Sequence, residues 1–305
     1  MTTGTLDAAY AADGRFLYGL AYRMTGSAAD AEDVVQATFE RALTARPDED
    51  RPLRPWLVRV TCNLARDALR RRRRRGYIGP WLPEPIPSDE AAIAGFEVPS
   101  TEGRYELLET ISFGFLLALE VLSPNQRAVL LLREVLAYDV AETATALGLS
   151  ETNVKVLHHR ARKAMSGYEH ERAHLGSAAA RAVLEQFVMA LAAGDHDTLV
   201  RLVRDDVRLL NDGGGVVSAA RRPVVGRDKA LLFMTKLNGR RGPPSTAEIR
   251  KIAGGAAFIA RYSGGRPNEP RDAVLTLVLD HEGRIAQCLW VVHPGKLRAV
   301  GLGTP

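Results

Sequence analysis

The chain has 305 residues, of which 46% are hydrophobic and 25% are charged, and its formal net charge is +5. This length suggests two or three domains, and the composition excludes a globally disordered chain. Its two cysteines, Cys62 and Cys288, stand far apart and outside any CxxC pair, so they predict neither a disulfide framework nor a cysteine metal site. The N-terminus lacks a signal-peptide pattern and no apolar run approaches the roughly 18 residues of a membrane span, so we expect a cytoplasmic protein without a membrane anchor.

The N-terminal part, from Leu6 to Leu69, has the periodicity of helices. In "ADAEDVVQATFERAL" apolar residues recur at spacings of three and four, and Asp30 stands near the start, where an acid favours the helix dipole. A second helix is predicted through "PWLVRVTCNLARDALRRR", where Pro55 suits the first turn and the apolar residues share one stripe. This part is therefore expected to be all-α.

A proline-rich stretch then separates two helical regions. We expect residues 77–103 to form an extended linker, because their prolines prevent a continuous helix. Helical patterning returns at Tyr105 and continues to about Leu175, with Ser123 as a predicted cap and Pro124 in a first turn.

The most informative stretch is "YDVAETATALGLSETNVKVLHHRARKAM". It predicts a short helix from Asp139 to Leu147, a turn at Gly148 and a second helix capped by Ser150. From Thr152 to Tyr168 there are basic residues but no acid, so the second helix has the charge of one that enters a DNA groove. The alternative is a helical hairpin with a solvated face. The side chains expected on the outside and at the DNA are Thr152, Asn153, Lys155, Val156, His159, Arg160 and Lys163.

Beyond Gly176 the pattern changes to that of an α+β domain. "AAARAVLEQFVMALAAGDHDTLVRLV" predicts two further helices, whereas "RDAVLTLVLDHEGRIAQCLWVV" alternates like two strands joined at Asp280 to Gly283.

Several of these motifs resemble the sigma-70 family. The helix-turn-helix, with "LSPNQRAVLLLREV" before it, resembles the fourth region of sigma factors, and "SAADAEDVVQATFERAL" and "RPWLVRVTCNLARDALRRRRRR" resemble the second. Two such regions without the first and third are similar to the extracytoplasmic-function group. The resemblance implies two all-α domains: residues 6–76 would bind core RNA polymerase and the downstream promoter element, and residues 104–175 would read the upstream element.

The resemblance also assigns residues to each partner. The polymerase-binding set is Asp30, Asp33, Gln36, Phe39 and Arg41, and the promoter DNA set on the second-region helix is Arg59, Arg66, Arg70 and Arg73. The run Arg70 to Arg75 has two readings, because successive residues step about 100° round a helix and cannot share a face. It is either a solvated helix end at the favourable pole of the dipole or a concentration of charge beside promoter DNA, and the DNA context favours the second.

Three further motifs resemble the sigma-factor group that carries a fused C-terminal SnoaL-like domain, an α+β cone of the NTF2 type. They are "WLP" at 81–83, "NDGGG" at 211–215 and "HPGKL" at 293–297, and the domain would span residues 178–302. The resemblance implies regulation in cis. The residues that it assigns are Trp81, Leu82, Pro83, Asp212, Gly213, Gly214, Gly215, His293, Pro294, Lys296 and Leu297. On the residues alone, "DGGG" reads as a turn between helix and strand, because it lacks the strand-before, helix-after context of a phosphate loop.

The sequence patterns that could indicate an enzyme are less specific than these motifs. His170, Glu171 and His174 match HExxH, but no third zinc ligand stands at a convincing spacing. The group Asp195, His196 and Asp197 reads as a turn and helix cap rather than a general base. Three other aspartates, Asp206, Asp212 and Asp272, have no evident partner in the sequence.

We therefore expect a sigma factor with no catalytic residues, no cofactor and no metal, a monomer when free, with core RNA polymerase and promoter DNA as partners. A DNA-associated enzyme or small-molecule sensor that uses a pocket in the C-terminal domain is the alternative, and an isolated repressor is a third.

Overall fold

The computed structural model describes residues 3–45, 47, 52–87, 110–171, 177–263 and 266–303. The chain divides into two compact units. Unit 1 combines Met1–Gly76 with Ser88–Gly167, and unit 2 combines Tyr77–Pro87 with Tyr168–Pro305. Most of the predicted linker, residues 88–103, lies outside the described residues.

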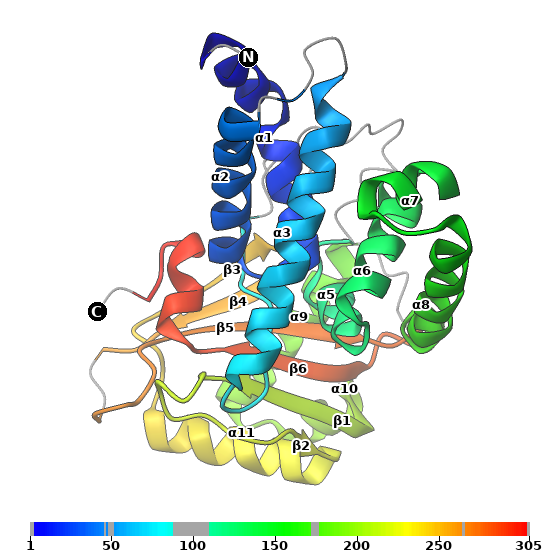
Figure 1. The fold of residues 1–305 in the computed structure, drawn as a ribbon. Helices are drawn as coiled ribbons and strands as arrows, with labels where there is room; N and C mark the ends of the chain where they lie inside the picture. Colours follow the sequence, from blue (N-terminus) through cyan, green and yellow to red (C-terminus); the bar gives the residue numbers. More distant parts are fainter. Residues whose placement is uncertain are drawn as a thin grey trace. The chain divides into compact units, whose positions relative to one another are not determined.

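The first part of unit 1 is a bundle of three helices: α1 (Thr3–Thr25), α2 (Ala28–Ala45) and α3 (Leu53–Arg75) (Figure 1). Gly26 adopts a positive φ of 68° and ends α1, and the Ser27 hydroxyl then accepts a hydrogen bond from the backbone N–H of Asp30 at the start of α2. The helices bury one apolar stripe each, as the periodicity predicts. Buried members of this core include Leu17, Leu20, Val34, Leu57 and Leu69.

The second part of unit 1 is also helical. It contains α5 (Phe113–Ala118), the 3₁₀ turn η2 (Leu119–Val121), α6 (Pro124–Leu130), the π-helical turn η3 (Leu131–Val135), α7 (Val140–Leu147) and α8 (Glu151–Glu171). Ser123 caps α6 through a capping box with Gln126, and Pro124 occupies the first turn. The start of this helix is therefore where the sequence predicts it.

Helices α7 and α8 form the predicted helix-turn-helix. Asp139 caps α7 and forms a capping box with Glu142, and Gly148 ends the helix in the left-handed conformation with a φ of 64°. The Ser150 hydroxyl accepts from the backbone N–H of Asn153 at 3.2 Å, which fixes the first turn of α8. Each break in this motif thus has a local cause in the sequence.

Unit 2 is built on one mixed sheet with strand order β2-β1-β6-β5-β4-β3. β1 pairs in parallel with β6, and the other pairs are antiparallel. The Asp280 carboxylate accepts from the backbone N–H groups of Glu282 and Arg284, which closes the predicted β5–β6 hairpin. The strands are β1 (Val203–Asp212), β2 (Val224–Val225), β3 (Thr246–Ile252), β4 (Gly255–Arg261), β5 (Asp272–Leu279) and β6 (Ile285–Val291).

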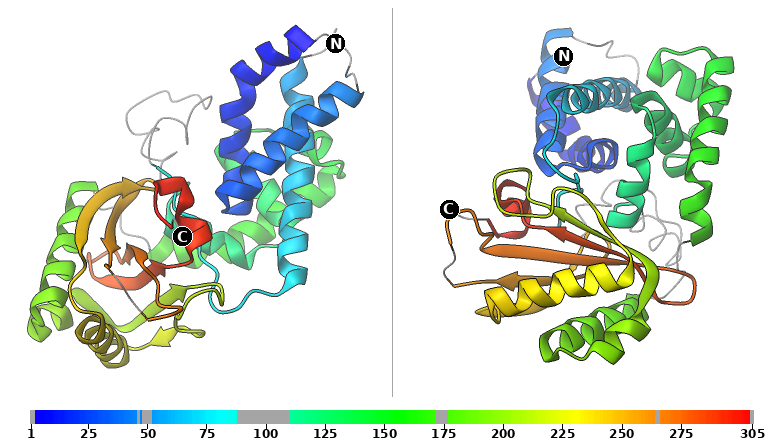
Figure 2. Two further views of the ribbon diagram at one scale, coloured as in Figure 1. Left: turned by 90° about the vertical axis from the view of Figure 1, so that its left-hand side faces the viewer. Right: turned by 90° about the horizontal axis from the view of Figure 1, so that it is seen from below.

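Helices α9 (Ser177–Ala193), α10 (His196–Leu202) and α11 (Arg227–Arg241) cover one face of this curved sheet, and a 3₁₀ helix, η4 (Pro294–Val300), follows β6 (Figure 2). The core between helices and sheet contains Phe187 of α9, Leu199 of α10 and Leu231 of α11, all buried against apolar strand residues. The predicted fold class, two all-α regions followed by an α+β cone domain, is confirmed.

The segment Tyr77–Pro87 belongs to unit 2 and is packed rather than loose. Leu82 and Ile86 are buried, the Ile86 carbonyl accepts from the backbone N–H of Ala253, and Pro87 forms an isolated bridge with Ile252 at the end of β3. Its prolines do exclude helix, but its apolar residues supply burial that an exposed connector would lack.

The prediction that the glycine motif is a turn between a helix and a strand was wrong. β1 runs directly into Gly213, so a strand, not a helix, precedes the turn. No helix follows at once, since β2 comes before α11, and the phosphate-loop context is still incomplete.

Candidate functional site

The outer face of α8 is the candidate DNA-reading surface. All seven side chains assigned to it from the sequence are exposed, whereas Val154, Ala161 and Met165 of the same helix are buried in unit 1. Val156 is 42% exposed, which leaves its methyl groups free for an apolar contact such as that with a thymine methyl. The separation of faces follows from the three- and four-residue spacing of the buried positions.

His158 lies beside this surface but is engaged elsewhere. Its Nε2 atom lies 2.5 Å from Oε1 of Glu134 in η3, so it contributes to the packing of α8 rather than to the outer face. From Thr152 to Tyr168 the helix carries Lys155, Arg160 and Lys163 on its outer face and no acid. Such a surface suits phosphate and base contacts, which need donors and positive charge.

The arginines assigned to DNA on α3 fall into two groups. Arg59 and Arg70 are exposed, and Arg70 pairs with Asp67 on the same helix at 2.9 Å. Arg66 donates to Oδ1 of Asn125 at 3.1 Å, and Arg73 donates to the carbonyl of Leu122. Arg66 and Arg73 are therefore already bonded to the second part of unit 1.

Glu120 is the centre of this contact between the two parts of unit 1. Nη2 of Arg72 donates to both of its carboxylate oxygens at 2.7 Å, and Nη2 of Arg127 donates to Oε1, also at 2.7 Å. The Arg127 side chain is buried and also donates to the carbonyl of Met24 at 2.9 Å. Burial opposes ionisation of Glu120, but the charges of Arg127 and Arg72 outweigh it and lower the pKa of the carboxyl group.

The arginine run is therefore neither wholly solvated nor wholly available to DNA. Arg72 and Arg73 have partners in the second part of unit 1, whereas Arg71, Arg74 and Arg75 are exposed. Only the structure distinguishes these positions, because the residue type is the same throughout.

The residues assigned to polymerase follow the outer side of α2. Asp33, Gln36 and Arg41 are exposed, and Asp30 and Phe39 are half-buried. The Phe39 ring meets the ring of Tyr10 edge to face, with centroids 5.0 Å apart. The set thus combines an exposed polar row with an aromatic pair, which is the composition of many protein interfaces.

The motifs "WLP", "NDGGG" and "HPGKL" meet around the carboxylate of Asp212, which is fully buried. Oδ1 of Asp212 accepts from the hydroxyl of Tyr77 at 2.5 Å, and Oδ2 accepts from the backbone N–H of Leu82 and from Nζ of Lys296, both at 2.7 Å. We call Tyr77, Trp81, Leu82, Asp212 and Lys296 the Asp212 cluster. The sequence analysis missed Tyr77, although it stands just before the "WLP" motif.

Lys296 connects the cluster further. Its Nζ atom donates to the carbonyl of Leu82 at 2.6 Å and lies 4.3 Å from the centroid of the Trp81 ring and 4.8 Å from that of Tyr77. A buried ammonium is thus compensated by a carboxylate, a carbonyl and two aromatic faces. Pro83 and Leu297 are buried, and His293 and Pro294 are half-buried.

The glycines of the motif permit a close approach. A Cβ on Gly214, whose φ is 59°, would collide with the His293 ring, and one on Gly215 would lie 2.8 Å from Cδ1 of Ile78. Gly213 is equally crowded, since a Cβ there would lie 2.8 Å from the Cβ of Ala219. The turn therefore has a packing role within unit 2 that its sequence alone does not reveal.

The structure supplies partners for the three aspartates that have no evident partner in the sequence. Asp212 is the centre of the cluster, Asp206 forms an ion pair with Arg204 at 2.8 Å, and Asp272 lies 3.6 Å from Arg261 and accepts from the backbone N–H of Gly303. These partners come mostly from other strands or loops, which the sequence does not place.

The enzyme-like patterns find little support in the described part of the chain. The Asp195 carboxylate accepts from the backbone N–H of Thr198 at 3.0 Å and caps α10, which is the turn-and-cap reading. The side chains of the HExxH pattern at 170–174 lie outside the described residues. Within the residues that are described, no group of three or more His, Cys, Asp or Glu side chains has the arrangement of a metal site.

Two other sequence expectations concern the cysteines and the membrane. Cys62 and Cys288 are free, fully buried thiols, and burial raises the pKa of each to about 12. Among the helices within the described ranges, none combines the length and apolar character needed to cross a bilayer.

Comparison with known proteins agrees with this geometry. The model of sigma-70 region 2 matches residues 9–75, and that of sigma-70 region 4 matches residues 113–165. The extracytoplasmic-function (ECF) RNA polymerase sigma factor SigJ of Mycobacterium tuberculosis is 32% identical over 294 residues, covering 92% of this chain and 89% of SigJ. The probable ECF RNA polymerase sigma factor SigI of the same organism is 28% identical over 296 residues, covering 96% of this chain and 94% of SigI.

The fold is similar over nearly the whole length as well. The crystal structure of M. tuberculosis SigJ matches with a TM-score of 0.76 and 30% identity, covering 97% of this chain and 99% of SigJ. The resemblance expected from the sequence is thus confirmed in both sigma regions and in the C-terminal α+β domain. The chain belongs to the extracytoplasmic-function RNA polymerase sigma factors.

Proposed function

We propose that this sigma factor binds core RNA polymerase through the outer side of α2, reads the upstream promoter element with the exposed face of α8 and is regulated in cis by unit 2. The observation that carries the proposal is the α8 face, where every side chain assigned to DNA is exposed and none is acidic. It is a cytoplasmic monomer until it binds core polymerase, and it selects start sites without catalysing a reaction itself.

The contacts of α3 add a step to this function. Arg66 and Arg73 are bonded to Asn125 and Leu122, so their use on promoter DNA requires these bonds to break. When arginine binds the phosphates of DNA, counterions are released from the DNA, and this release provides a driving force for that exchange. We infer that promoter engagement loosens the contact around Glu120.

The Asp212 cluster supports the regulatory part of the proposal. It holds the segment that directly follows α3 in the chain, since Tyr77 and Leu82 both donate to Asp212. A change in this cluster would alter the freedom of the residues that join the two sigma regions. Regulation would then change the amount of transcript without changing the promoter sequence that α8 selects.

The decisive experiment is initiation in vitro with core polymerase and a library of genomic promoters. The double variant Lys155→Glu with Arg160→Glu should lose promoter-specific transcripts, because it reverses two charges on the reading face. The matched control Lys229→Glu with Lys236→Glu makes the same charge change on the exposed side of α11 and should keep them. Specific initiation by the α8 variant at the level of the control would contradict the proposal.

A further inference from the structure

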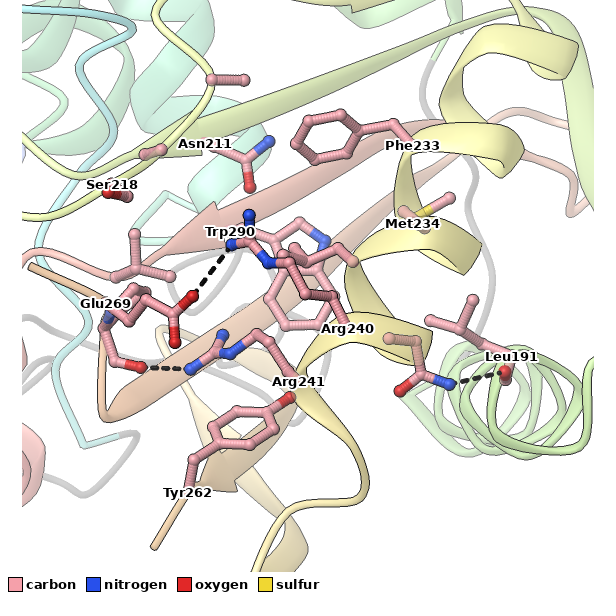
Figure 3. Close-up of a pocket in the computed structure, with 16 residues that line it drawn as sticks. Leu191, Asn211, Ser218, Phe233, Met234, Arg240, Arg241, Tyr262, Glu269 and Trp290 are labelled. Carbon is pink, nitrogen blue, oxygen red and sulfur yellow. Dashed lines mark hydrogen bonds and ion pairs between the residues drawn. The ribbon is translucent and has the colours of Figure 1, made fainter. Parts of the chain in front are cut away.

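Unit 2 contains a cavity of about 280 Å³ that the sigma function does not use. Figure 3 shows its walls: Phe233 and Met234 from α11, Asn211 from β1, Trp290 from β6 and Leu191 from α9. Most of this lining is apolar, and two aromatic rings contribute to it. A cavity of this size and composition suits a small organic molecule whose surface is mainly apolar.

One polar group in the wall has no partner. The side chain of Asn211 is buried, with 7% of its residue surface exposed, and its Nδ2 atom forms no hydrogen bond. The other amide in the wall differs, because Nδ2 of Asn238 donates to the carbonyl of Leu191 at 3.2 Å. A buried donor without an acceptor costs free energy, and an acceptor on a ligand would recover it.

The edge of the cavity is positively charged. Arg240 pairs with Glu269 at 3.1 Å, and the guanidinium of Arg241 lies 3.7 Å from the centroid of the Tyr262 ring while it donates to the carbonyl of Pro270. Two arginines and one glutamate leave a formal charge of +1 among these side chains. The edge therefore favours a neutral or anionic ligand over a cation.

The cavity shares a wall with the glycine motif. Ser218, Ala219 and Ala220 line it and also line a second hollow on the side of Gly213–Val217. Asn211 is the residue next to Asp212, the centre of the cluster. A molecule in the cavity would therefore press on the chain that holds the Asp212 cluster in place.

We propose that this cavity is an effector site for a planar, mainly apolar organic molecule that carries a carbonyl or carboxylate oxygen. The rings of Phe233 and Trp290 contact its apolar body, and its oxygen accepts a hydrogen bond from Nδ2 of Asn211. The inference rests on the proposed cis regulation by unit 2, since the effect of the molecule is transmitted through Ser218–Ala220 to the Asp212 cluster.

The binding test uses the full chain and three probes of equal shape, measured by isothermal titration calorimetry. 2-Naphthoate and 2-acetylnaphthalene carry the required oxygen, and 2-ethylnaphthalene does not. We expect the first two to bind about tenfold more tightly than the third, the ratio typical of one buried hydrogen bond. Absence of saturable binding, or equal affinity for all three, would overturn the proposal.

Variants locate the site. Asn211→Leu keeps a similar volume and should remove the advantage of the two oxygen-bearing probes while leaving 2-ethylnaphthalene binding within about threefold. Thr276→Val is the matched control, because the Thr276 hydroxyl is also buried and unpartnered but lies outside the cavity lining. Leu237 of α11 also lines the cavity. Leu237→Trp should therefore fill the cavity and abolish binding of every probe, which tests the site even if the Asn211 variant does not fold.

A transcription assay separates this inference from the proposed function. Without any probe, promoter-specific initiation by the full chain tests the proposed function alone. Saturating 2-naphthoate should change the transcript yield of the unmodified chain at least about twofold and leave the Leu237→Trp variant unchanged. Binding without a change in yield would overturn the effector role, and initiation without any probe binding would overturn the site but not the sigma function.

Discussion

Lys296 donates to the buried carboxylate of Asp212 at 2.7 Å, across 84 positions of the sequence. Only 7% of the Lys296 side chain is exposed and none of the Asp212 side chain, so each charge depends on the other for compensation. The same pair brings together three motifs that are separate in the sequence. It therefore couples the stability of unit 2 to the position of the segment 77–87.

Replacement of Lys296 by Met should destabilise unit 2 by about 3–5 kcal/mol, because the Asp212 charge would stay buried without its cation. Urea unfolding measures the change in the free energy of unfolding, and hydrogen exchange of the β6 amides measures the change within unit 2. The double variant Asp212→Asn with Lys296→Met should recover part of the loss, and Lys229→Met at an exposed position should change little. Equal stability of K296M and K229M would exclude a structural role for the pair.

The contact at Glu120 should depend on pH. The pKa of Glu120 is lowered in the folded chain, so its ionised form contributes stability that is fully present above the ordinary glutamate pKa of 4.5 and is lost as pH falls through the folded pKa. The variant Glu120→Gln should be less stable by about 1–3 kcal/mol at pH 7. Its disadvantage should shrink below pH 4.5, which thermal unfolding from pH 7 to pH 3 would show. A constant difference between the two chains would contradict this account.

Gly214→Ala should disrupt the glycine motif through a side-chain collision. Its added Cβ would meet the His293 ring, and the alanine would also have to adopt a φ of 59°. Gly301→Ala is the control, since Gly301 has a φ of 74° in the ordinary left-handed region but no atom within 4 Å of the added Cβ. The control carries only the backbone penalty of about 1 kcal/mol, and Gly214→Ala should lose clearly more in thermal unfolding. Similar losses in both variants would mean that the close approach is unimportant.

Both cysteines should be unreactive in the folded chain. Burial raises the pKa of Cys62 and of Cys288 to about 12, so the thiolate population at pH 8 is very small and access is blocked. Mass spectrometry after iodoacetamide treatment should find no modification of the native chain and two modifications of the chain unfolded in guanidinium. Rapid labelling of either cysteine before unfolding would show that its unit opens.

The helix-turn-helix was predictable because its determinants are local. Asp139, Gly148 and Ser150 fix the helix ends through bonds to neighbours in the sequence, and the spacing of Val154 and Ala161 sets the buried face of α8. The same reasoning found the β5–β6 hairpin and the capped start of α10. Where one turn of chain contains both partners, the sequence pattern is sufficient.

The arginine run and the aspartates show the other limit. Because the six arginines are identical, the sequence does not indicate that Arg72 pairs with Glu120 while Arg74 and Arg75 stay exposed. Nor does it indicate that Asp212 bonds to Tyr77 and Lys296. The sequence by itself determined the sigma regions, the exposed basic face of α8 and the α+β character of the C-terminal domain, because periodicity and helix caps act over a few residues. Only the tertiary structure decided which charges are paired and which wall amide is left without a partner, because those contacts join segments dozens of positions apart and depend on how the helices and sheet pack.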